Sequence, residues 1–118
     1  MSARPLSLAS IADAVFEVVP ELPDYTVILP GTSELTLSPI AGEEGEAGSV
    51  SAVKWEVGGL QFINMPMATS AYLAAGSLVV TNDDGSTFEV NTGEGLYTEP
   101  GWSGKFTATS PITMFLHV

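Results

Sequence analysis

The chain has 118 residues, 45% of them hydrophobic, and its 3 basic and 14 acidic residues give a net charge of −11. This length suits one domain with a single core, so we expect residues 1–118 to form one domain. The negative charge disfavours binding to nucleic acids and to anionic membrane surfaces. The sequence contains no cysteine, which excludes disulfides and thiolate sites. No apolar run is long enough to span a membrane, and Asp13 and Glu17 interrupt any signal-like segment, so we expect a cytoplasmic protein.

The first 24 residues are expected to form a helical or extended segment ahead of a β-barrel. In SLASIADAVFEVV (7–19), Leu8, Ile11, Val15 and Val19 recur at helical spacing. This spacing predicts one short helix. We expect the segment to lie across the outside of the barrel or against a partner subunit.

Residues 25–118 are dominated by short runs of β-branched or alternating apolar residues. In 50–57, Val53, Trp55 and Val57 alternate with polar residues, which predicts a strand with Trp55 in the core. The pair Asp84-Gly85 predicts a hairpin turn. The predicted strands cover 25–29, 34–40, 50–57, 60–64, 71–82, 86–91, 95–98, 105–109 and 112–118. Nine or ten short strands without a second helix indicate an all-β sandwich or barrel.

Three stretches carry a resemblance to a known family: KWEVGGLQF, YLAAGSLVVTNDDGSTFEV and GEGLYTEPGWSGKFTATSPITMFLHV. With their glycine spacing, residues from about 50 to 118 resemble the cupin superfamily. They look most like small single-domain cupins related to ethanolamine-utilisation Q-type proteins and ureidoglycine aminohydrolases. The resemblance implies a double-stranded β-helix (jelly-roll) barrel, usually a homodimer, with its site inside the barrel mouth.

In metal-dependent cupins, two histidines and a glutamate of a first motif and a histidine of a second motif hold a divalent metal. The resemblance maps these four positions onto Ile63, Met65, Thr69 and Gly104, all poor ligands for such a metal. We therefore expect no transition metal and no cofactor. The resemblance also places Met114 where the family has a lysine on the last strand, which weakens any carry-over of its activities.

The mapped positions also predict a site for a small molecule. Ile63 and Met65 make the barrel mouth apolar, and Trp102 lies in sequence beside the vacant histidine position. Gly104 leaves space there that an aromatic ring could fill. We predict that Ile63, Met65, Thr69, Trp102 and Gly104 line a ligand-binding site suited to an uncharged ligand.

Two functions remain in competition, and whether the protein is an enzyme stays open. One is a metal-free barrel that binds a small neutral or apolar molecule or acts as a dimeric module. The alternative is a metal-independent isomerase, lyase or amidohydrolase acting on a small polar metabolite. For that enzyme, Glu56, Tyr97 and Glu99 are the candidate proton-transfer groups. A carboxylate buried beside a tyrosine would favour the enzyme, and a closed apolar interior would favour binding. The single histidine, His117, is expected to be structural or at the surface.

Overall fold

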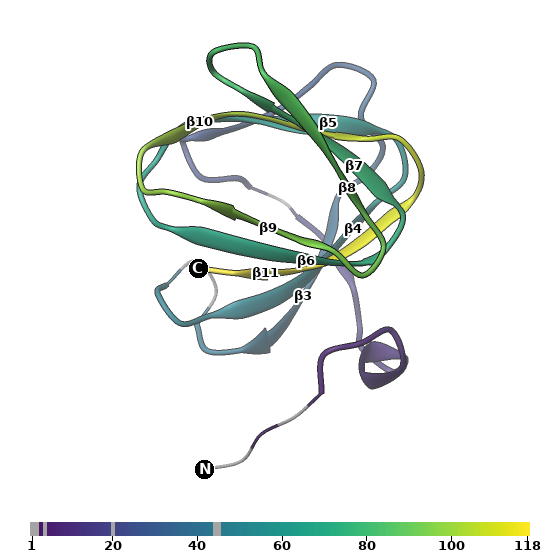
Figure 1. Cartoon of the computed structure of the whole chain (residues 1–118). Coiled ribbons are helices and arrows are strands. Elements are labelled where there is room, and N and C mark those ends of the chain that lie inside the picture. Colours follow the sequence, from purple (N-terminus) through teal and green to yellow (C-terminus); the bar gives the residue numbers. More distant parts are fainter. Residues whose placement is uncertain (1–2, 4, 20, 44–45) are drawn as a thin grey trace.

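The computed structural model describes residues 3, 5–19, 21–43 and 46–118. Residues 1–2, 4 and 20 of the predicted N-terminal segment lie outside this description. Two antiparallel sheets face each other and enclose the interior (Figure 1). Among the described residues, no helix is long and apolar enough to cross a bilayer.

The described residues form eleven strands in a six-stranded and a five-stranded sheet. In spatial order, the first sheet comprises β1 (Glu17–Val18), β3 (Thr36–Ala41), β4 (Val50–Trp55), β11 (Ile112–His117), β6 (Thr69–Ala75) and β9 (Gly95–Thr98). The second sheet comprises β2 (Thr26–Ile28), β5 (Gly58–Met65), β10 (Trp102–Ala108), β7 (Ser77–Asn82) and β8 (Thr87–Asn91). The predicted all-β jelly-roll class is confirmed.

The core lies between the sheets because alternate residues of each strand point inward. On β4, Val53 and Trp55 are buried while Lys54 is exposed, as the period of two predicts. Trp55 is 2% exposed, and its indole nitrogen donates to the carbonyl oxygen of Gly58 at 3.0 Å. The prediction that Trp55 belongs to the core is confirmed.

The N-terminal segment lies on the outer face of the first sheet, as one of the two expectations had it. Ile11 packs there against Ala52 and Phe115, and the ammonium of Lys54 lies 4.0 Å from the ring centroid of Phe16. Figure 1 shows the helical turn outside the barrel, below this sheet. The segment thus shields apolar side chains that would otherwise face water.

The predicted N-terminal helix is much shorter than its apolar spacing suggested. Only Ala9–Ile11 is helical, as a single 3-10 turn. Glu17 and Val18 instead pair with Leu37 and Thr36 of β3, and the amide of Val19 donates to Leu35 at 3.0 Å. Sheet pairing with a distant strand therefore overrides the local helical pattern.

The predicted hairpin at Asp84-Gly85 joins β7 to β8. The amide of Asn82 donates to the carbonyl oxygen of Ser86 at 2.8 Å. Hydrogen bonds from the side chain and the backbone of Ser86 hold the pKa of Asp84 below its usual value. The hairpin is confirmed, whereas the run predicted over 71–82 is two strands separated by Gly76.

The corner between β4 and β5 depends on Gly58 and Thr32. Gly58 has φ +88°, and a Cβ atom there would lie 2.4 Å from the Cα of Thr32. The hydroxyl of Thr32 donates to Leu29 at 2.6 Å and also bonds the backbone of Gly59. This corner therefore requires a residue without a side chain, because both the backbone angle and the space exclude one.

We expect Gly58→Ala to lower the free energy of unfolding by about 2–4 kcal/mol, because backbone strain and a steric clash add. Chemical denaturation measures this change. Gly85→Ala is the matched control: Gly85 has φ +89°, but no atom lies within 4 Å of the place that a Cβ would take, so it should lose only about 1 kcal/mol. Equal losses in the two variants would contradict the role of the Thr32 contact.

Candidate ligand-binding site

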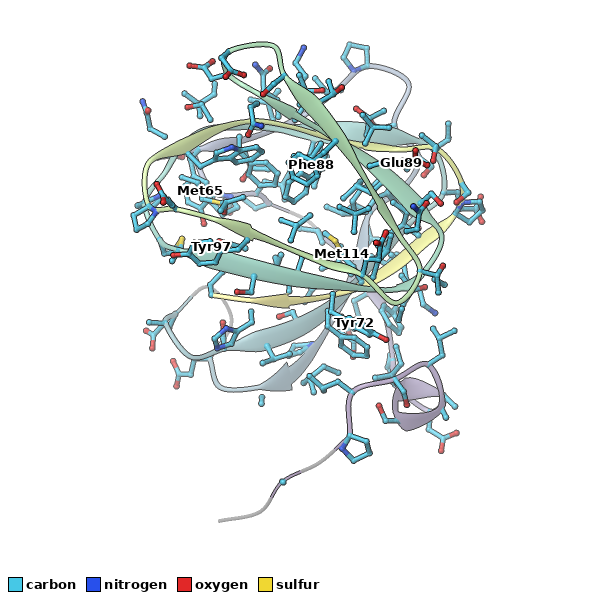
Figure 2. All side chains as sticks on the ribbon, in the orientation of Figure 1. Met65, Tyr72, Phe88, Glu89, Tyr97 and Met114 are labelled. Carbon is cyan, nitrogen blue, oxygen red and sulfur yellow. The ribbon has the colours of Figure 1, made fainter. Side chains whose placement is uncertain are left out.

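A cavity of about 150 Å³ lies between the two sheets. Its wall is mostly apolar and comes from both sheets. Large apolar side chains in the wall include Leu35, Leu60, Phe62, Phe106, Met114 and Leu116. Figure 2 shows Met65 and Met114 inside the barrel and Tyr72 outside it, on the side of the N-terminal segment.

One side of the cavity is lined by the connection between β1 and β2, which we call the strap (residues 19 and 21–25). β1 belongs to the first sheet and β2 to the second, so the strap crosses from one sheet to the other. Val19, Leu22 and Tyr25 are partly buried against the core, and all three line the cavity. The strap thus forms part of the binding wall.

Two hydroxyl groups lie in the cavity wall near the strap. Thr69 is 1% exposed, and its hydroxyl lies 3.4 Å from the carbonyl oxygen of Met67 and 3.7 Å from the sulfur of Met65. The hydroxyl of Tyr25 lies 3.6 Å from the sulfur of Met67. Burial raises the pKa of Tyr25 above its usual value, so this group is a neutral hydroxyl at pH 7.

The indole of Trp102 occupies the space over Gly104. A Cβ atom at position 104 would lie 2.3 Å from Cζ2 of Trp102 and 2.3 Å from the carbonyl oxygen of Thr81. The ring centroid of Trp102 lies 6.0 Å from that of Phe62 and 5.5 Å from that of Phe106. The indole nitrogen donates to Oδ1 of Asn82 at 2.9 Å. The aromatic ring expected to fill the space at Gly104 is therefore Trp102 itself.

The structure brings together only part of the predicted ligand-binding set. Met65 and Thr69 line the cavity, whereas Ile63 is 47% exposed. Trp102 contacts Phe62 and Phe106 of the cavity wall, whereas Ile63 and Gly104 line a second, separate pocket.

Ile63 and Met65 face opposite ways because of a bulge between β5 and β10. The pairing register shifts between Trp102 and Gly104, and Asn64 takes φ +49°. Two successive residues, Ile63 and Asn64, therefore point outward before Met65 turns in.

The residues at the four mapped positions do not fit a divalent transition metal. Ile63 faces outward, Met65 and Thr69 offer a thioether and a hydroxyl, and Trp102 covers Gly104. Such metals in this kind of site require imidazole or carboxylate donors. Within the parts of the chain that the structure describes, no group of three or more His, Cys, Asp or Glu could hold a metal ion.

The candidate proton-transfer groups lie outside the cavity. Glu56, Tyr97 and Glu99 are exposed, Tyr97 by 60%, and none of them lines the cavity. His117 is also exposed, at the end of β11. The structure therefore places no carboxylate of this set beside a buried tyrosine.

Comparison with known proteins identifies the fold but no specific activity or ligand. No family model and no curated protein matches the chain. The polyketide cyclase RemF from Streptomyces resistomycificus is similar in structure, with TM-score 0.68, 20% identity, 98% of this chain and 78% of RemF covered. A cupin-like protein from Thermotoga maritima has TM-score 0.63 and 12% identity over 88% of this chain and 80% of its own. The chain has the cupin fold.

The Clostridium difficile EutQ protein is a further cupin-fold neighbour, with TM-score 0.61 and 13% identity over 74% of this chain and 68% of its own. The resemblance to cupins that the sequence carries is thus confirmed at the level of the fold.

Sequence reasoning missed the cavity residues that come from the strap, from β4 and from the connection between β5 and β6. Tyr25, Leu22, Met67 and Ser51 all line the cavity. An apolar residue and a tyrosine flanking Pro23, just before the first β-branched run, were the available signal for the strap. Met67 lay next to the mapped positions, in the stretch Met65-Pro66-Met67.

We expect Gly104→Ala to lower the free energy of unfolding by about 1–3 kcal/mol, because the new methyl group forces the indole of Trp102 to move. The fluorescence emission of Trp102 should change at the same time. Ser103→Ala, one position away and partly exposed, should leave the emission close to that of the wild type. Unchanged stability and emission in Gly104→Ala would contradict the packing of Trp102 over Gly104.

Thr98 supplies a second test of the interior. It pairs with Thr69 across β6 and β9, it is 4% exposed, and its hydroxyl has no hydrogen-bond partner among the described residues. We expect Thr98→Val to raise the free energy of unfolding by about 1 kcal/mol, because it removes an unsatisfied buried hydroxyl. Thr32→Val, which removes a bonded hydroxyl, should lower it by a similar amount. Destabilisation by Thr98→Val would contradict the isolation of that hydroxyl.

Proposed function

We propose that this cupin-fold protein, with no transition metal bound, binds a small, uncharged, largely apolar molecule inside its barrel. The observation that carries the proposal is the cavity of about 150 Å³ with its mostly apolar wall. A cavity of this size and lining accepts a molecule about as large as benzene. A packed core is expected to leave few voids larger than a water molecule.

The charges around the cavity support a neutral ligand. No lysine, arginine or histidine is among the described residues that line it, and the acidic Glu21 stands at the strap. An anionic ligand would therefore lose its hydration without gaining a counter-charge. A cation would gain only Glu21, which is exposed to water.

The same arrangement favours binding over catalysis. The carboxylates considered for proton transfer are exposed, and a general base must come within hydrogen-bond reach of the group that it deprotonates. A molecule held in the cavity meets thioether, aromatic, aliphatic and hydroxyl groups instead.

Toluene is a suitable probe for this proposal. At ten times its dissociation constant, toluene should raise the free energy of unfolding by about 1.4 kcal/mol, because it binds only the folded state. Ser51 is buried and faces the cavity, so Ser51→Leu should fill part of the space and abolish the stabilisation. Ser70→Leu, at an exposed position of the same sheet, is the matched control and should retain it.

Denaturant titrations with and without toluene measure these effects, and ligand-observed NMR checks binding directly. Absence of toluene binding to the wild type would overturn the proposed function. Equal stabilisation of the wild type and Ser51→Leu would place the toluene outside the cavity and would overturn it as well.

A further inference from the structure

One buried hydroxyl, of Thr69, and one partly buried hydroxyl, of Tyr25, lie in the cavity wall near the strap and have only poor partners among the described residues. The Tyr25 hydroxyl has the sulfur of Met67 at 3.6 Å. The Thr69 hydroxyl has the sulfur of Met65 at 3.7 Å and the carbonyl oxygen of Met67 at 3.4 Å. Thioether sulfur is a weak acceptor, and hydrogen bonds between oxygens are normally about 2.7–2.8 Å long. Both groups therefore retain unused hydrogen-bonding capacity.

The two hydroxyls come from distant parts of the chain but share one neighbour, Met67. Tyr25 precedes β2 in the strap, and Thr69 begins β6. Both contact Met67, in the connection between β5 and β6, and both line the cavity. Both hydroxyls thus lie beside Met67 on a wall that is otherwise mostly apolar, and we call this pair the polar spot.

The poorly bonded hydroxyl of Thr69 is unfavourable, because burial has removed its hydrogen bonds to water, and the partly buried hydroxyl of Tyr25 has lost some of its own. A ligand oxygen in the cavity would restore those bonds. We infer that Tyr25 and Thr69 bind the single oxygen of a neutral, ring-sized ligand: a phenol, a cyclic alcohol or a cyclic ketone. This inference rests on the proposed function and adds the chemical class of the ligand.

The class follows from what each hydroxyl can do. A hydroxyl both donates and accepts, so the pair can bind the oxygen of either an alcohol or a ketone. Ser49 and Ser51, also in the cavity wall, are neutral groups as well. A carboxylate is disfavoured, because the cavity wall offers no cationic side chain among the described residues and includes Glu21.

Three probes of nearly equal size separate the classes: toluene, p-cresol and 4-methylbenzoate. p-Cresol is neutral at pH 7 because phenols ionise near about pH 10. In the wild type, p-cresol should bind at least as tightly as toluene, although its hydroxyl must leave water. 4-Methylbenzoate should bind at least about tenfold more weakly than p-cresol. Isothermal titration calorimetry and ¹H–¹⁵N NMR titrations measure the affinities.

Thr69→Val and Tyr25→Phe remove one hydroxyl each and keep most of the side-chain shape. Each should weaken p-cresol binding by about three- to tenfold and leave toluene binding unchanged or slightly tighter. Thr113→Val and Tyr72→Phe are matched controls. Both residues are in the sheet of Thr69 but are not among the cavity-lining residues, so they should change neither affinity. Thermal unfolding of each variant verifies that it is folded.

The outcomes distinguish the inference from the proposal on which it rests. If toluene binds but p-cresol binds more weakly, or if both hydroxyl variants weaken the two ligands equally, the inference is overturned and the apolar site remains. If 4-methylbenzoate binds as tightly as p-cresol, the neutral class is overturned. If none of the three probes binds, the proposed function itself fails.

Discussion

The indole of Trp102 lies over position 104 because glycine there carries no side chain. Phe62 and Phe106 pack against the same ring, and Asn82 accepts its N–H. This packing leaves no room for a side chain at position 104. Phe62 and Phe106 also line the cavity, so the ring of Trp102 supports two residues of the wall of the candidate site.

The cavity joins parts of the chain that are far apart in sequence. The strap supplies Tyr25 and Leu22, the start of β6 supplies Thr69, and the last strand supplies Met114. The strap runs from β1 in one sheet to β2 in the other. Binding at this site would therefore depend on the relative position of these two strands. The polar spot includes a strap residue, and most of the remaining wall is apolar, so an amphipathic ligand would have a preferred orientation.

The sequence predicted the strands well where the pattern is local. The alternation around Trp55 and the Asp84-Gly85 turn depend on neighbouring residues, and the structure confirms both. The helix over 7–19 depended on a pattern that the pairing of Glu17–Val18 with β3 overrode. Only part of the candidate site was predicted, because its geometry also depends on features that a local pattern does not show. Met65 and Thr69 follow from the resemblance to cupins, but the bulge at Asn64 separates the inward Met65 from the outward Ile63. A one-residue bulge reverses the inward and outward positions that follow it, and neither its place nor the path of the strap is encoded in a periodic pattern.

Met65, Met67 and Met114 give the cavity wall three thioethers, two of them in contact with the hydroxyls of Thr69 and Tyr25. Oxidation converts such a side chain into a polar sulfoxide, whose oxygen is a strong hydrogen-bond acceptor. A sulfoxide at Met67 would offer Tyr25 the acceptor that it lacks and would make the apolar wall polar. Oxidation of these sulfurs would therefore weaken the binding of an apolar ligand. Conversely, an apolar molecule in the cavity would shield the sulfurs from oxidants.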